Sequence, residues 1–196
     1  VGEVIRTTFD KKVQLKNPDI ELRIEIIDNM ALIGVEKING YGGLPVGTSE
    51  KGLSLISSGI DSPVASFKML NRGVQLFYIH FHSYPATGDE SIKNVKKIIT
   101  ELSKFQSNTT LFSVPFLDIQ KKIMQSAPNK SWIILFRRAM IKVASRVAKE
   151  NNAKVLITGE NVGQVASQTL SNINVISQAS EVPILRPLIG YNKKDI

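Results

Sequence analysis

The most informative part of this sequence is LSLISSGIDSPVA, residues 53–65. Its apolar start predicts a short strand over residues 53–56, and the small residues that follow predict a tight turn in which Gly59 can take a positive φ. A helix is expected from Asp61, which is placed to cap it, with Pro63 in the first turn, where proline is tolerated. The start of a helix presents unpaired N–H groups and a positive dipole end. The stretch therefore predicts an anion-binding turn. Three hydroxyls there are available to phosphate oxygens: Ser57, Ser58 and Ser62.

Strands and helices alternate on both sides of this turn. Apolar and β-branched runs predict strands over 53–56, 74–81, 109–114 and 153–158, and an extended segment over 182–188. Apolar residues at helical spacing predict helices over 61–71, 89–105, 117–125, 132–151 and 164–171. Strands separated by helices need crossover connections, so we expect an α/β fold with a mostly parallel sheet and helices on both faces.

The first 40 residues have a different pattern, that of a small α+β remnant. Apolar residues alternate with charged ones over 20–26, Asp28-Asn29 supplies a turn, and residues 30–35 predict a partner strand. One hairpin without a covering helix is too little for a stable domain. The segment 39–49 then holds four glycines and one proline, so we expect a linker there and place the domain boundary near residue 45.

Composition narrows the classes of function. The 196 residues are 42% hydrophobic and 21% charged, which is typical of a globular protein. The absence of cysteine excludes a disulfide scaffold, a thiolate metal site and a cysteine nucleophile within this chain, and with only two histidines we expect no protein-built metal site. The net charge of +8 favours a polyanionic partner such as nucleic acid. No apolar run approaches ~18 residues and no leader is seen, so we expect a cytoplasmic protein with no membrane partner. The chain starts at Val1 rather than Met, which suggests a fragment of a longer protein.

The phosphate-binding turn matches neither G-x-x-x-x-G-K-[ST] nor G-x-G-x-x-G. A plain strand-to-helix turn capped by serine and aspartate would explain it without any ligand. The turn also resembles the S-G-G-x-D-S signature of the PP-loop ATP pyrophosphatases, which cleave ATP between the α- and β-phosphates and adenylate a substrate oxygen. Ser58 stands where that signature has glycine, and a β-carbon there narrows the turn.

Four blocks in the same order resemble the ThiI family of tRNA uridine 4-sulfurtransferases. They are residues 42–48 (GGLPVGT), 57–65 (SSGIDSPVA), 159–170 (GENVGQVASQTL) and 185–190 (LRPLIG). The resemblance implies that residues 1–45 are the C-terminal part of a tRNA-binding THUMP domain plus a linker. Residues 46–196 would then be a PP-loop ATP-binding domain.

The same resemblance implies an activity. Members of the family use ATP and Mg²⁺ to adenylate uridine 8 of tRNA, and a persulfide sulfur then displaces AMP to leave 4-thiouridine. The sulfur comes from a cysteine desulfurase or another persulfide donor, and many bacterial members also serve thiamine thiazole synthesis. The family tends to form homodimers. It commonly uses a cysteine downstream of the LRPLIG block, in a region that would lie beyond Ile196.

The resemblance to the family also implies which residues of this sequence bind the nucleotide, by matching them to positions in the family's motifs. We expect the nucleotide to contact the turn residues, the ends of the first two strands, the long helix and the block after the fourth strand: Leu55, Ile56, Ser57, Ser58, Gly59, His80, Phe81, Arg137, Gly159 and Gln168. Asp61 and Ser62 are the candidate catalytic residues. Without the resemblance, Arg137 and Gln168 would be interpreted as surface residues and Gly159 as a strand terminator. Trp132, Phe136 and Met140, four residues apart, predict a core stripe rather than a base-stacking platform.

Two other functions stay open on the sequence. The chain could be a non-catalytic tRNA-binding module whose PP-loop has degenerated at Ser58. It could also be a PP-loop synthetase that acts on a small molecule. A failure to bind ATP with magnesium would favour the non-catalytic module over an enzyme. Pyrophosphate release that depends on tRNA would count against the small-molecule synthetase.

Overall fold

The computed structural model describes residues 1–165 and 168–196. The chain divides into two compact units, Val1–Gly42 and Gly43–Ile196. The domain boundary near residue 45 stays a prediction.

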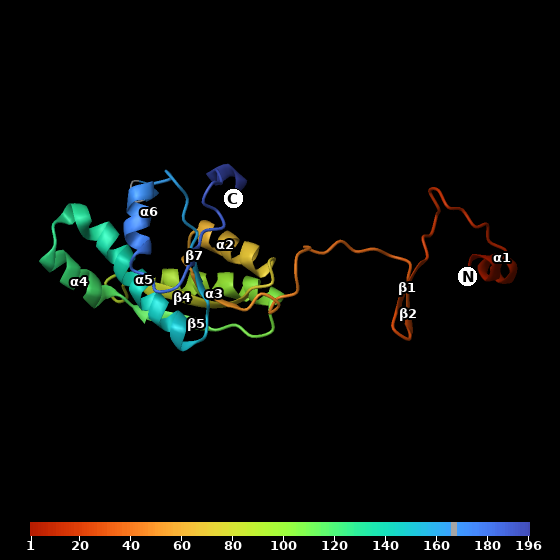
Figure 1. Cartoon of the computed structure of the whole chain (residues 1–196), viewed down its shortest axis with the longest axis horizontal. Helices are drawn as coiled ribbons and strands as arrows, with labels where there is room; N and C mark the ends of the chain where they lie inside the picture. Colours follow the sequence, from red (N-terminus) through yellow and green to blue (C-terminus); the bar gives the residue numbers. More distant parts are fainter. Residues whose placement is uncertain (166–167) are drawn as a thin grey trace. The chain divides into compact units, whose positions relative to one another are not determined.

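The second unit is built on a five-stranded sheet with the order β5-β4-β3-β6-β7. Figure 1 labels β4, β5 and β7 of this sheet among the helices of the unit. Every neighbouring pair in this sheet is parallel. The strands are β3 (Lys51–Leu55), β4 (Gln75–His82), β5 (Leu111–Pro115), β6 (Val155–Ile157) and β7 (Ile184–Leu185). The predicted α/β class is confirmed. The chain builds outward from β3 to β5 and then returns to add β6 on the other side of β3, so the strand order reverses beside β3, where ligands bind in open parallel sheets.

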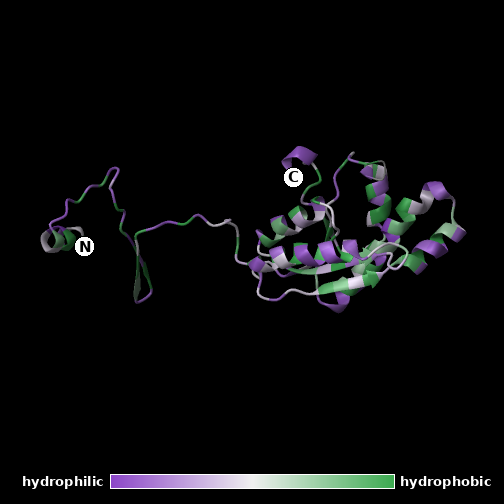
Figure 2. Ribbon diagram, turned by 180° about the vertical axis from the view of Figure 1, so that it is seen from behind, coloured by the Kyte–Doolittle hydropathy of each residue, from purple (hydrophilic) through white to green (hydrophobic). Residues whose placement is uncertain are grey.

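Helices cover both faces of the sheet, as the sequence predicts. The face on which α2 (Asp61–Leu70) and α3 (Glu90–Leu102) lie holds one hydrophobic core, with Ala65, Val95 and Ile99 at its centre. The opposite face holds a second core against α5 (Trp132–Glu150) and α6 (Leu170–Ser177). Figure 2 is coloured by hydropathy, and the ribbons of helices such as α3 alternate between hydrophobic green and hydrophilic purple along their length. Each such helix therefore has one apolar and one polar face. The remaining helix, α4 (Leu117–Ser126), packs against α5.

The strands supply both cores because successive side chains point to opposite faces. In β4, Tyr78 joins the core under α2 and α3, and the next residue, Ile79, joins the core under α5. In β6, Leu156 and Ile157 divide in the same way. A strand that is buried on both faces reads as a nearly continuous apolar run, which is the pattern that locates these strands in the sequence.

Two predicted elements need correction. The helix expected over 164–171 is wrong at its start, because Gln164 and Val165 are not helical, and residues 166–167 of that prediction lie outside the described residues. Helix α6 begins at Leu170, where the Thr169 hydroxyl accepts the Asn172 N–H at 3.2 Å and caps the helix. Asp61 does not cap α2 either. The cap position is Ile60, and the carboxyl of Asp61, already inside the helix, makes no capping hydrogen bond.

The first unit contains a helix, α1 (Gly2–Phe9), and a hairpin of β1 (Arg23–Ile27) and β2 (Met30–Gly34). The predicted hairpin is confirmed, with Ile27 opposite Met30 and Asp28 at φ 50° in the turn. The helix α1 is missing from the sequence prediction. None of the residues in this unit is buried, so it contributes no core.

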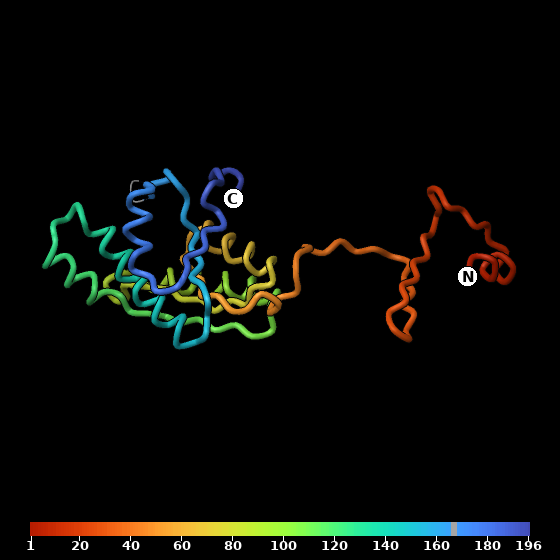
Figure 3. The backbone as a smooth tube through the Cα atoms, in the orientation of Figure 1, coloured from red at the N-terminus to blue at the C-terminus, as the bar shows by residue number. Residues whose placement is uncertain are grey.

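The C-terminal segment returns beside α2, as the tube in Figure 3 traces. Lys68 on α2 lies 4.4 Å from the centroid of the Tyr191 ring, and Leu188 is fully buried in the core on that side. A short 3₁₀ turn, Lys193–Asp195, lies near the end of the chain. No helix among residues 1–165 and 168–196 is long and apolar enough to cross a membrane.

Candidate functional site

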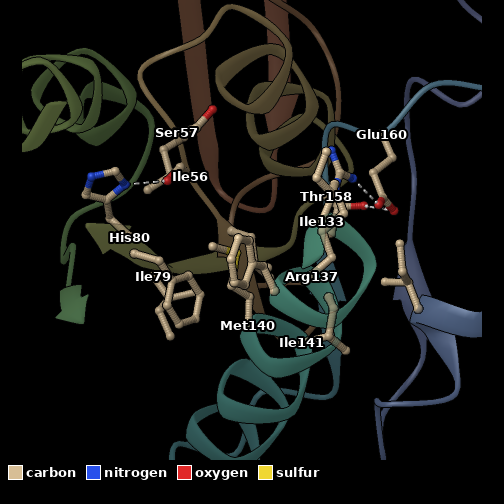
Figure 4. Close-up of a pocket in the computed structure, with 14 residues that line it drawn as sticks. Ile56, Ser57, Ile79, His80, Ile133, Arg137, Met140, Ile141, Thr158 and Glu160 are labelled. Carbon is tan, nitrogen blue, oxygen red and sulfur yellow. Dashed lines mark hydrogen bonds and ion pairs between the residues drawn. The ribbon is translucent and has the colours of Figure 1, made fainter. Parts of the chain in front are cut away.

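A cavity of about 410 Å³ lies at the carboxyl ends of β3, β4 and β6. Its floor comes from the strand ends and one wall comes from α5, as Figure 4 shows. Six of the predicted nucleotide-contacting residues line it: Leu55, Ile56, Ser57, His80, Phe81 and Arg137. Most of its other walls are apolar, so the cavity can enclose a flat apolar group such as a purine while its polar side faces the phosphate-binding turn.

The polar side of the cavity is a cluster in which one carboxylate is shared by two guanidinium groups. Arg137 Nη1 donates to Glu160 Oε1 at 2.8 Å, and Arg186 Nε donates to Glu160 Oε2 at 2.7 Å. The Thr158 hydroxyl also donates to Oε2, at 3.2 Å. The Glu160 side chain is only 9% exposed, so the pairing replaces the water that this carboxylate has lost. With two cations and one anion, the cluster carries a net positive charge at the cavity.

The predicted phosphate-binding turn is closed by its own serines. The Ser57 N–H donates to the Ser62 hydroxyl at 2.9 Å, and the two hydroxyl oxygens lie 3.0 Å apart. Ser58 and Gly59 are exposed beside this pair. Gly59 does not take the positive φ that the sequence suggests, because the turn passes directly into α2 through Ile60 in helical conformation. The Ser62 hydroxyl therefore stabilises the conformation of the turn through its contacts with Ser57.

Asp61 is the acid of this turn. One of its carboxylate oxygens, Oδ1, is buried and accepts no hydrogen bond from residues 1–165 or 168–196. A buried acceptor without a partner is costly, so its presence beside an anion-binding turn is typical of a functional site rather than of a structural cap.

The imidazole of His80 is held at both nitrogens. Nδ1 lies 2.9 Å from the Ile56 carbonyl oxygen and Nε2 lies 2.8 Å from the Ser91 hydroxyl. A carbonyl only accepts, so Nδ1 carries the proton and Nε2 accepts from Ser91. Burial lowers the pKa of His80, although its hydrogen bond to Ile56 opposes the shift. The neutral ring therefore fixes the strand end that borders the cavity.

Gly159 and Gln168 do not line the cavity. A β-carbon on Gly159 would lie 2.7 Å from both the carbonyl carbon of Asp61 and the nitrogen of Ser62, so this glycine lets the end of β6 contact the start of α2. Gln168 is buried, and its side-chain oxygen has no hydrogen-bond partner among the described residues. The two residues before it lie outside the described residues.

Several residues that line the cavity are absent from the sequence-based prediction of the site. Phe136 and Met140, interpreted as core, face it together with Ile133 and Ile176. Their four-residue spacing was the available signal, but the spacing alone does not say whether a helix faces a core or a cavity. Glu160 lies inside the quoted block 159–170, but the two arginines that pair with it are more than twenty residues away in sequence.

The helix that forms one wall of the cavity belongs to a basic segment of the chain. Residues 117–142, which include α4 and the start of α5, contain six Lys and Arg and one acid, Asp118. We call this segment the basic hairpin. Its four lysines, at 121, 122, 130 and 142, are exposed, and those at 121, 122 and 130 make no ion pair with any described residue. Exposed positive charge therefore lies on the segment that includes the start of α5, the helix that lines the cavity.

A parallel α/β sheet with a serine-rich turn and a cavity at the strand ends defines a protein of the PP-loop class. The family model described as "Thiamine biosynthesis protein (ThiI)" matches residues 47–196, and the THUMP domain model matches residues 1–36. The chain belongs to the ThiI family.

Named relatives agree with this family. A protein of Finegoldia magna named "Probable tRNA sulfurtransferase" is 44% identical over 94% of this chain and 47% of its own length. One of Brevibacillus brevis with the same name is 46% identical over 98% of this chain and 48% of its own length. The chain thus spans about half the length of the curated relatives it matches.

A solved structure supports the fold and the family further. The chain superposes on a crystal structure of a 4-thiouridine synthetase–RNA complex with bound ATP, at a TM-score of 0.85 and 38% sequence identity. The match covers 98% of this chain and 51% of that one.

Proposed function

We propose that this chain is the ATP-binding and tRNA-activating part of a tRNA sulfurtransferase that makes 4-thiouridine. The observation that carries the proposal is the cavity at the strand ends, which joins an apolar enclosure to a positively charged cluster beside the serine-rich turn. The likeness to a synthetase described with RNA and bound ATP supports it. We further propose that the nucleotide modified is uridine 8 of tRNA.

ATP fits the chemistry of this cavity. A purine would lie among Phe81, Phe136 and Met140, and the phosphates would extend toward Arg137 and the turn. The backbone amides of Ser58 and Gly59 and the start of α2 would hold the pyrophosphate half. Gly159, which lies against the start of α2, would act by supporting the turn. A contact between Gln168 and the nucleotide stays a proposal.

Magnesium would be bound chiefly by the nucleotide. Among residues 1–165 and 168–196 no three His, Cys, Asp or Glu side chains gather as a metal site. Mg²⁺ usually keeps several waters and takes one or two carboxylates plus the substrate phosphates. Asp61, with its unpartnered buried oxygen in the turn, is the carboxylate suited to this, and Mg²⁺ would neutralise phosphate charge there.

In the activation step, O4 of the uracil would attack the α-phosphorus of ATP, pyrophosphate would leave, and the N3 proton of the base would be lost to solvent. The base becomes linked to AMP through oxygen, and AMP is a far better leaving group than the original carbonyl oxygen. The protein contributes mainly position and charge neutralisation, through Arg137 and the turn amides. Since the 196 residues hold no cysteine, the persulfide sulfur that displaces AMP would come from outside them, with a cysteine desulfurase as the proposed source. A role in thiamine thiazole synthesis and a homodimer are proposed on the same family ground.

The tRNA would approach over the basic hairpin, which lies beside the cavity. Exposed lysines without ion pairs are available to backbone phosphates, and such contacts are the main source of affinity for nucleic acid. The hairpin therefore places RNA-binding charge next to the proposed site of adenylation.

The deciding experiment measures pyrophosphate release from ATP and Mg²⁺ with and without unmodified tRNA. We expect release that depends on tRNA and is lost when uridine 8 is replaced by cytidine. ATP binding without any release would favour the non-catalytic module. Release that ignores tRNA and rises with a small-molecule acceptor would favour a synthetase instead.

A further inference from the structure

The Arg137–Glu160–Arg186 cluster contains one guanidinium more than the carboxylate needs. Each guanidinium binds a different oxygen of Glu160, and Thr158 adds a third donor. The two arginines also differ in surroundings. The Arg137 side chain is 31% exposed and lines the cavity, whereas that of Arg186 is 13% exposed and lies outside the cavity lining. Arg186 is anchored further by a 2.8 Å hydrogen bond from Nη2 to the Ser177 hydroxyl on α6.

This asymmetry matters when an anion enters the cavity. A buried carboxylate that loses its only cationic partner is strongly destabilised, so a lone Arg137–Glu160 pair would resist opening. Here Glu160 keeps Arg186 and Thr158 after Arg137 leaves, and the carboxylate stays paired. The guanidinium of Arg137 can then turn its donors to phosphate oxygens, which match its planar fork.

We propose that Arg137 exchanges Glu160 for the phosphates of the bound nucleotide, and that Arg186 is the positioning residue that permits this exchange. The inference rests on the proposed ATP binding and goes beyond it, because Arg186 acts on affinity without touching the nucleotide. Each member of the cluster then has a distinct role. Arg137 changes partner, Glu160 pairs with Arg137 until the nucleotide binds, and Arg186 remains the ion-pair partner of Glu160 afterwards.

The test is calorimetric titration of the full chain with ATP and Mg²⁺ and, separately, with adenosine. In Arg186→Met, Glu160 depends on Arg137 alone, so we expect ATP binding to weaken about tenfold or more. Adenosine has no phosphate and does not require the exchange, so its affinity should be unchanged. The double variant Arg186→Met/Glu160→Gln removes the carboxylate that retains Arg137 and should recover most of the ATP affinity.

Arg146→Met is the matched control, since it also removes a guanidinium from an ion pair, with Glu150 on the exposed side of α5. It should bind ATP as the unmodified chain does. Equal losses for ATP and adenosine in Arg186→Met would overturn the exchange and make Arg186 a structural residue. Unchanged ATP affinity, or a double variant weaker than the single one, would overturn it as well. If the unmodified chain bound adenosine but not ATP, the proposed function itself would fail.

Discussion

At the scale of single residues, the tightest constraint is the close approach between Gly159 and the start of α2. Gly159→Ala would put a methyl group 2.7 Å from backbone atoms of Asp61 and Ser62, and backbone cannot turn aside as a flexible side chain does. We expect a decrease of about 1–3 kcal/mol in the free energy of unfolding, together with weaker ATP binding, because the turn must shift. Urea denaturation and titration with ATP measure the two effects.

The control for this substitution is Gly190→Ala. Gly190 has no atom within 4 Å of its would-be β-carbon and no positive φ, so the added methyl group meets open space. A Gly159→Ala variant as stable as Gly190→Ala would contradict the close approach.

His80 makes the stability of the second unit depend on pH. Its pKa in the folded state is lowered, chiefly by burial, with the neighbouring His82 adding to the shift. The unfolded chain therefore binds a proton at a higher pH than the folded one, and the free energy of unfolding falls as pH drops below the usual histidine value of about 6.5. Denaturation curves at pH 7.5 and 5.5 should show a loss that is smaller in His80→Asn, which keeps a donor for Ile56. An equal loss in both proteins would assign the pH dependence to other groups.

At the scale of elements, the sequence predicts a helix or strand well where the pattern of its own residues determines it. The apolar spacing of α3 and α5 and the apolar run of β4 predict those elements within three residues of their ends. The start of α6 depends on a hydroxyl cap at Thr169, which the apolar pattern does not reveal. The Glu160 cluster joins β6, α5 and the segment after β7, so only the strand order brings it together. The same holds for Phe136, whose spacing fits a core and a cavity equally well.

The basic hairpin carries a prediction at this scale. Lys121→Glu/Lys122→Glu should weaken tRNA binding at low salt and lower the slope of log K against log salt by about one for each phosphate that is no longer neutralised. ATP affinity should not change, because neither lysine lines the cavity. Filter binding of tRNA between about 50 and 200 mM salt supplies the slopes.

Lys154→Glu is the matched control for the hairpin. Lys154 is exposed and directly precedes β6 at its amino end, so it lies at the opposite end of the sheet from the cavity. The same change of charge there should affect tRNA binding less. Equal decreases in affinity would mean that net charge, rather than the hairpin, governs the binding.

At the scale of the whole molecule, charge and core both belong to the second unit. Residues 1–42 contain six Lys and Arg against seven Asp and Glu, so the net charge of +8 arises entirely from residues 43–196. All the buried core residues also lie in that unit. The unit that matches the THUMP model thus contributes no net positive charge, so we expect the second unit to supply most of the electrostatic attraction to RNA.

This division predicts how a chain of residues 43–196 behaves. It should fold, because both cores are intact, and bind ATP within about twofold of the full chain, because every residue lining the cavity is retained. Its affinity for tRNA should fall, but the salt slope should stay close to that of the full chain, since the slope counts phosphates neutralised by Lys and Arg. Parallel salt titrations of the two chains measure this. A slope that falls sharply when residues 1–42 are removed would show that the lysines and arginines of the first unit bind RNA despite its overall charge, and would exclude the basic hairpin as the main electrostatic site.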